Sequence, residues 1–140
     1  MSEPPGMTFD QWLEAWKDEI LQTTEFTKSD MPTMAAEIQT DLNRTTRDYP
    51  RMAELLAEVE QHISNCRAQE TLHVKGDPKY ADFTSPERKT VVDSRISHII
   101  RTRDILKTTC RALEERSFCL MGQRRYAEAE LRMTGRGEAE

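Results

Sequence analysis

Glycine, cysteine and aromatic residues are scarce in this chain, and long apolar runs are absent from it. Five glycines in 140 residues leave few positions for tight turns, and aromatic residues make up only 6% of the chain. No apolar run approaches the roughly 18 residues that a membrane-spanning helix requires, and no signal-peptide pattern is present. With 32% charged and 36% hydrophobic residues, the composition is typical of a soluble intracellular helical protein with a modest core.

The chain also lacks the motifs of common catalytic and metal sites. It has no glycine-rich phosphate loop, no catalytic triad order and no zinc-ligand spacing, so we expect no enzyme activity, no cofactor and no metal. The chain has three cysteines, Cys66, Cys110 and Cys119, an odd number without paired spacing. This indicates reduced thiols. We interpret Cys66 and Cys110 as small core residues. His62 and His73 are interpreted as ordinary, partly exposed histidines.

Charge is distributed unevenly along the chain, whose net charge is −5. Residues 1–76 carry 7 Lys and Arg against 14 Asp and Glu, whereas residues 77–140 carry 13 against 11. The basic half can attract the acidic half within or between subunits, or it can face a polyanion. Interspersed charges on a solvated helix surface are the simpler alternative.

The first half of the chain predicts three helices. Thr8 and Gln11 are spaced as a capping box, and the apolar side chains that follow share one face: Phe9, Trp12, Leu13, Trp16 and Ile20. Residues 23–30 are polar and predict a loop. A second helix is expected to begin at Asp30 and Pro32 and to break at Pro50, and a third to end near Leu72. Residues 75–84 predict a reversal of the chain.

The last helix carries the longest apolar pattern. Ser85, Pro86 and Glu87 form a start signal, and we expect an unbroken helix from there to Met133. Its seam positions follow a 3-4 spacing over about four heptads: Val92, Ile96, Ile99, Arg103, Leu106, Cys110, Leu113, Ser117 and Leu120. Because one short chain has little surface to cover this stripe, we expect other helices, and copies of the chain, to pack against it. The predicted interface between copies is Ile96, Ile99, Arg103, Leu106, Cys110, Leu113 and Leu120. The pattern leaves open whether the seam is filled within one subunit or between subunits.

Arg103 at a seam position needs a partner, since a buried unpaired arginine is costly. We expect it to pair with a carboxylate of the acidic half, with direct ligand contact as the alternative.

The predicted fold is all-α: an elongated helical subunit with a short aromatic N-terminal helix, a broken antiparallel helix pair and a long C-terminal heptad-bearing helix. It forms a single domain over 1–140, with flexible tails at 1–7 and 134–140.

Basic residues gather around the reversal, where two aromatic residues accompany them. The predicted set for binding nucleic acid is Arg67, Lys75, Lys79, Arg88 and Lys89, interleaved with Tyr80 and Phe83. Phosphates require cations and unpaired bases require flat apolar faces, so this pattern indicates a groove for a single strand. Ordinary solvent-exposed lysines are the alternative interpretation.

The C-terminal half resembles the UvsY family of recombination mediators of T4-like phages. The resemblance rests on residues 85–92 (SPERKTVV), followed by Leu106, Cys110, Ala112, Leu113, Arg116, Ser117, Phe118, Arg125 and Tyr126. It extends to the N-terminal layout of Met7, Thr8, Trp16, Pro32 and Met34. The chain departs from the family pattern in residues 65–72, where Arg67 is the one basic residue.

This resemblance implies a protein that binds single-stranded DNA and forms a closed ring of copies, a hexamer or heptamer. It also implies a role in loading a RecA-like recombinase onto strands coated by single-strand binding protein, in DNA recombination, repair and replication. The expected location is the cytoplasm of a phage-infected bacterial cell. The alternative is a non-enzymatic helical adaptor or assembly protein that binds a protein partner.

Overall fold

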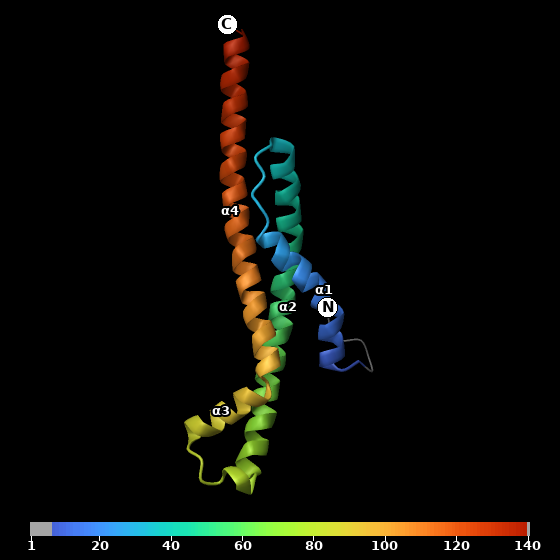
Figure 1. Ribbon diagram of the computed structural model, residues 1–140, viewed down its shortest axis with the longest axis vertical. Coiled ribbons are helices and arrows are strands. Elements are labelled where there is room, and N and C mark those ends of the chain that lie inside the picture. Colours follow the sequence, from blue (N-terminus) through green and yellow to red (C-terminus); the bar gives the residue numbers. More distant parts are fainter. Residues whose placement is uncertain (1–6, 140) are drawn as a thin grey trace. The chain divides into compact units, whose positions relative to one another are not determined.

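The computed structural model describes residues 7–139, with side chains for residues 7–134. Its elements are α1 (Phe9–Thr27), α2 (Ala35–Gly76), the 3-10 helix η1 (Pro78–Tyr80), α3 (Ser85–Arg95) and α4 (Ser97–Ala139), as drawn in Figure 1. Every regular element in the described part is helical, which confirms the all-α prediction with a long last helix. Across these residues, none of the helices combines the length and the apolar character needed to cross a bilayer.

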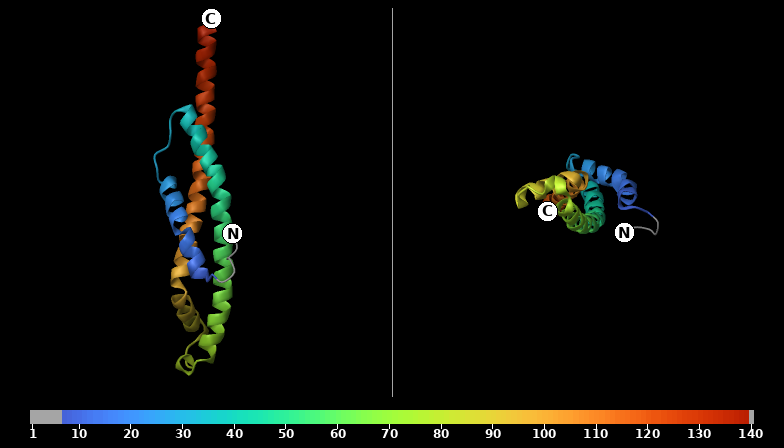
Figure 2. Two further views of the ribbon diagram at one scale, coloured as in Figure 1. Left: turned by 90° about the vertical axis from the view of Figure 1, so that its right-hand side faces the viewer. Right: turned by 90° about the horizontal axis from the view of Figure 1, so that it is seen from below.

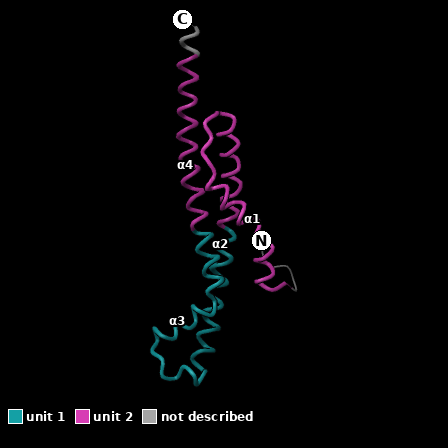
Figure 3. The backbone as a smooth tube through the Cα atoms, viewed as in Figure 1, with its two compact units in different colours: residues 1–2, 54–107 teal, residues 3–53, 108–140 magenta. Residues whose placement is uncertain are grey.

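The described chain divides into two compact units, coloured separately in Figure 3. Unit 1 contains residues 54–107. Unit 2 contains residues 7–53 and 108–139. Helices α2 and α4 each contribute residues to both units, whereas α1 belongs to unit 2 and α3 to unit 1.

In unit 2, α1 begins at the predicted cap and continues further than expected. The backbone N–H of Gln11 donates to Thr8 Oγ1, and the Thr8 N–H donates to Gln11 Oε1, so the capping box is confirmed. The loop predicted over 23–30 is wrong for its first half, because α1 runs to Thr27. Thr23 and Phe26 are buried, and burial of one face extends a helix beyond what local propensity favours.

The aromatic face of α1 is partly buried within unit 2 and contacts α2. Trp12 is 3% exposed, and its ring lies 5.3 Å from that of Phe9. The guanidinium of Arg51, on α2, lies over the Trp16 ring at 5.5 Å and is 2.7 Å from a carboxylate oxygen of Glu19. The ring contact and the ion pair together tie α1 to α2, which lie side by side in Figures 1 and 2.

A buried arginine on α4 holds the connection between α1 and α2. Arg116 is 5% exposed, and it donates to the carbonyl oxygens of Ser29 and Asp30 and to Asp41 Oδ2, at 2.6 Å. Its guanidinium lies 4.5 Å from the centre of the Phe26 ring. A guanidinium is stable in such a place only when acceptors surround it, so Arg116 fixes the path of residues 29–30.

The expected boundaries of α2 are both corrected by the structure. The helix begins at Ala35 rather than at Pro32, because the carbonyl of Asp30 is bonded to Arg116 instead of starting a helix. The break expected at Pro50 is absent, and α2 continues to Gly76. Proline removes one backbone hydrogen bond, and burial of residues on both sides, including Asp48 and Met52, outweighs that loss.

Unit 1 is an antiparallel arrangement of residues 54–76 of α2 against α3 and residues 97–107 of α4. Three ion pairs mark the register: Arg67–Asp93, Arg95–Glu70 and Lys107–Glu60. Its buried apolar side chains are Leu55, Val59, Ile63, Val74, Val92, Ile96, Ile99 and Leu106. The reversal predicted at 75–84 is confirmed, with η1 inside it.

The helix expected from Ser85 to Met133 is interrupted at Ile96. This residue has φ −110° and ψ 18°, and its carbonyl accepts from the N–H groups of both Ile99 and Ile100. Figure 1 shows α3 turned away from the start of α4. The turn allows Val92 and Ile96 to be buried together in unit 1. The cap of α3 is Thr84 rather than Ser85, and its Oγ1 accepts from the Glu87 N–H.

The apolar seam is already covered within one chain. Ile96, Ile99, Leu106, Cys110, Leu113 and Leu120 are between 0% and 9% exposed. The premise that copies must gather to bury these positions is therefore wrong, and they are not a free surface for a second subunit. Burial also raises the pKa of the Cys110 thiol.

Arg103 likewise differs from the prediction. It bonds to Asp104, its exposed neighbour on α4, and no bond to an acidic residue of the first half is seen among residues 7–76. The tail predicted at 134–140 is helical as far as Ala139. The expected N-terminal tail lies mostly outside the described residues, which begin at Met7.

We predict that Arg116→Met destabilises the protein by about 3 kcal/mol, because it leaves the Asp41 carboxylate and two carbonyls without their donor. Urea unfolding followed by circular dichroism measures the change. Arg124→Met is the matched control, since the Arg124–Glu128 pair is a surface pair at 3.9 Å and its loss should cost about 0.5 kcal/mol or less. Equal stability of the two variants would contradict the role given to Arg116.

Candidate nucleic-acid interface

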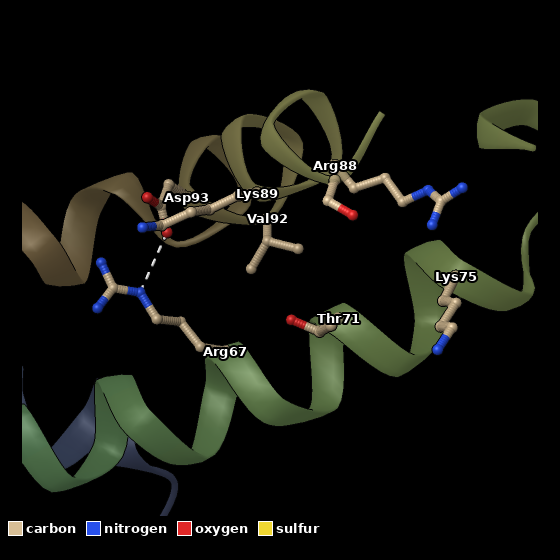
Figure 4. Close-up of a pocket in the computed structure, with 8 residues that line it drawn as sticks. Arg67, Thr71, Lys75, Arg88, Lys89, Val92 and Asp93 are labelled. Carbon is tan, nitrogen blue, oxygen red and sulfur yellow. Dashed lines mark hydrogen bonds and ion pairs between the residues drawn. The ribbon is translucent and has the colours of Figure 1, made fainter. Parts of the chain in front are cut away.

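Four of the five predicted basic residues line one groove in unit 1. The groove has a volume of about 550 Å³ and lies between α2 and α3 (Figure 4). Its lining residues are Arg67, Thr71, Lys75, Ser85, Arg88, Lys89, Val92 and Asp93. The fifth predicted residue, Lys79, belongs to η1 and does not line it.

Helical spacing explains why these side chains meet. Arg67, Thr71 and Lys75 stand four residues apart on α2 and therefore share one face. On α3, the lining residues 85, 88, 89 and 92 follow the 3-4 spacing of a single face. The two stripes face each other across the groove, and the ion pair between Arg67 and Asp93 joins them.

The charges within the groove are only partly neutralised. Arg67 Nε donates to Asp93 Oδ1 at 3.1 Å, and the two side chains are 40% and 34% exposed. Arg88 Nε is buried without a hydrogen-bond partner among the described residues. Figure 4 shows Arg88 and Lys75 toward one end of the groove, and Lys89, Asp93 and Arg67 toward the other.

The aromatic pair beside the groove is arranged differently from the prediction. The Tyr80 and Phe83 rings meet edge to face, with centres 5.2 Å apart. Lys79 Nζ lies 5.6 Å and the Arg95 guanidinium 5.9 Å from the centre of the Tyr80 ring, within the range of cation–π contacts. Hydrogen bonds to Tyr80 and Glu70 raise the pKa of Arg95. Tyr80 is therefore engaged with its own chain and is not an open stacking platform.

The groove also contains residues that the sequence pattern did not single out. Asp93 contributes the opposing charge, and Thr71 and Ser85 contribute hydroxyl groups to the lining. The four-residue spacing between Lys89 and Asp93 is the signal that could have identified the carboxylate. Val92, 3% exposed, gives the groove an apolar floor.

This arrangement is chemically suited to phosphate. Lysine ammonium groups act as compact point charges and guanidinium groups as forked donors, which together bind phosphate oxygens without reading bases. A single strand is flexible enough to place successive phosphates against both helices. Among the described residues there is no cluster of three or more histidine, cysteine or acidic side chains that could hold a metal ion.

We predict that Asp93→Asn strengthens binding of a single-stranded oligonucleotide several-fold at low salt. The substitution frees Arg67 for a phosphate, so log affinity should also fall more steeply with log salt, by about 0.7 for one added contact. Fluorescence anisotropy measures both quantities. Asp82→Asn, an exposed residue outside the groove lining, is the control with the same change in charge. Equal affinity of the two variants would contradict competition by Asp93.

Comparison with known proteins identifies no relative of this chain. No protein-family model matches it, no curated protein matches it, and no solved structure matches it.

Proposed function

We propose that this protein binds single-stranded DNA through the groove between α2 and α3 and acts as a non-enzymatic recombination mediator. The observation that supports DNA binding is the convergence of Arg67, Lys75, Arg88 and Lys89 on one groove. The mediator role is supported by the resemblance of residues 85–126 to the UvsY family. In that role the protein loads a RecA-like recombinase onto strands coated by single-strand binding protein, in the cytoplasm of a phage-infected bacterium.

Phosphate contacts explain how such a groove holds a strand without regard to sequence. Each cation that neutralises a phosphate releases counterions, so affinity depends steeply on salt. One chain offers few such contacts, and its net charge of −5 works against them. An assembly of several copies repeats the groove. Once one groove has bound, the effective concentration of the strand at the other grooves is high, so the overall affinity for the strand rises.

Assembly into a closed ring requires a surface other than the buried seam. The exposed apolar side chains on the unit 2 part of α4 are available for it: Phe118 77%, Met121 37%, Tyr126 67%, Leu131 66% and Met133 73% exposed. A helix with this many exposed apolar side chains is typical of an interaction surface. We propose that the contact between copies uses these side chains.

The same region also favours the second candidate function, a helical adaptor for a protein partner. An apolar recess of about 440 Å³ lies beside Phe118 and is lined in part by Pro50 and Met121. At its edge the Tyr49 hydroxyl donates to Glu114 at 2.7 Å, and this bond raises the pKa of Tyr49. An apolar side chain of another protein would fit such a recess, and this role needs no DNA binding.

We predict that Arg88→Glu/Lys89→Glu weakens binding of a labelled single-stranded oligonucleotide by more than tenfold at low salt. The loss of two phosphate contacts should reduce the slope of log affinity against log salt by about 1.4. Fluorescence anisotropy at two salt concentrations measures the effect. Micromolar protein that fails to bind at low salt would instead favour the adaptor.

The control for this experiment is Lys17→Glu/Arg111→Glu, which makes the same change in net charge on unit 2. Its affinity should fall much less, because neither residue lines the groove. Equal losses in the two double variants would mean that binding follows overall charge, and would remove the groove from the proposal.

We predict that the wild-type protein is larger than one chain by light scattering, and that Phe118→Glu/Tyr126→Glu reduces its mass. Leu21→Glu/Leu72→Glu, which alters two apolar side chains that are 54% and 73% exposed elsewhere, should leave the mass unchanged. Leu106→Glu should unfold the chain rather than dissociate copies, because Leu106 is fully buried. A monomeric wild-type protein would rule out the ring.

A further inference from the structure

The cations of the groove between α2 and α3 form two clusters, one at each end. Lys75 and Arg88 lie toward the first end, and Arg67 and Lys89 lie toward the second (Figure 4). Asp93, which accepts a hydrogen bond from Arg67, also lies at the second end. The first end therefore has two cations and no carboxylate among its described lining residues, whereas the second end is partly neutralised.

The middle of the groove is uncharged. The Thr71 hydroxyl group and the Val92 side chain lie between the two ends in Figure 4, and Val92 is 3% exposed. A phosphate held against Val92 would lose solvent without gaining a charged partner, which is unfavourable. Charge-assisted contacts to phosphate oxygens are available at the two ends instead.

The length of the groove determines how many linkages of a strand separate the two ends. Residues 67 and 75 of α2 differ by eight positions, which corresponds to about 12 Å at a helical rise of about 1.5 Å per residue. Successive phosphates of a nucleic-acid strand lie about 6–7 Å apart. The two ends are therefore spaced for phosphates that are two linkages apart, and not for adjacent phosphates.

We propose that the groove binds a single strand through alternate phosphates, one at each end, and leaves the phosphate between them in solvent. The proposal rests on the function proposed above and adds the spacing of its contacts. The contact at the first end is the stronger, because Asp93 competes for Arg67 at the second. The shortest strand that reaches both ends in this way has four nucleosides and three linkages.

Tetrathymidylate with free hydroxyl ends tests this spacing, because only its two outer phosphates can occupy both ends at once. A methylphosphonate linkage removes the charge of one phosphate and changes the backbone length little. We expect a neutral outer linkage to weaken binding roughly three- to fivefold, as expected for the loss of one exposed ion pair. A neutral central linkage should weaken it by less than about twofold, because solvent and salt screen that charge.

Nuclear magnetic resonance titration of the full chain measures these weak affinities from the amide shifts of α3 (Ser85–Arg95). Equal weakening by all three neutral linkages would overturn the proposal, because binding would then follow the number of charges. Weakening that is greatest for the central linkage would also overturn it.

A charge-removing variant tests the first end directly. Lys75→Gln/Arg88→Gln leaves cations only at the second end, which any charged phosphate of the strand can occupy. A neutral outer linkage should therefore weaken binding to this variant by less than about twofold. Lys79→Gln/Arg101→Gln makes the same change in charge within unit 1 at residues that do not line the groove, and should keep the three- to fivefold effect. Persistence of that effect in the first variant would overturn the proposal.

Failure of the spacing differs from failure of the proposed function. A long oligonucleotide that shifts the α3 amides, together with equal losses from the three neutral linkages, would retain the groove as a DNA site and overturn only the alternate contacts. A long oligonucleotide that leaves the α3 amides unshifted at low salt would overturn both. Circular dichroism of each variant confirms that it is folded before titration.

Discussion

The burial of one guanidinium group determines the architecture of unit 2. Removing arginine from water is unfavourable unless acceptors and an aromatic face replace the lost solvation. For its two terminal nitrogens Arg116 meets that requirement with the Asp41 carboxylate, two backbone carbonyls and the Phe26 ring, whereas its Nε is buried without a hydrogen-bond partner among the described residues. These partners come from α1, α2 and the segment between them, so one α4 side chain sets where α1 ends and how the chain enters α2. Arg44 lies 4.1 Å from the centre of the same Phe26 ring and adds a second cation to it.

Features that depend on local spacing could be predicted from the sequence. The Thr8 capping box, the helical content and the reversal before α3 all follow from neighbouring residues. The ends of α1 and α2 could not be predicted, because tertiary burial and the contacts of Arg116 decide them. Pro50 carries a strong local signal for a break, and packing on both sides of it overrides that signal. The bend at Ile96 could not be predicted either, because no glycine or proline lies near it in the sequence.

The basic residues of the candidate groove could be predicted from the sequence. The carboxylate that partly neutralises them could not. Helical periodicity places Arg67 and Lys75 on one face of α2, and that follows from sequence alone. The opposing carboxylate of Asp93 comes from another helix, so its effect on Arg67 emerges only in three dimensions. Prediction of the apolar seam was limited in the same way. Periodicity indicates that a helix face will be buried, but it does not indicate whether the same chain or another copy buries it. Burial of Leu106 and Leu113 within one chain answers that question.

The interruption at Ile96 makes α3 a separate helix of 11 residues. Isolated helices shorter than about 12–15 residues are marginal in water, and Val92 is the buried residue of α3. One wall of the groove is therefore held by its tertiary contacts, namely the burial of Val92 and the ion pairs to α2 through Asp93 and Arg95. An anionic ligand that contacts both walls would cross-link them and slow amide hydrogen exchange in residues 85–95. Binding of such a ligand would therefore be thermodynamically linked to local folding of this wall.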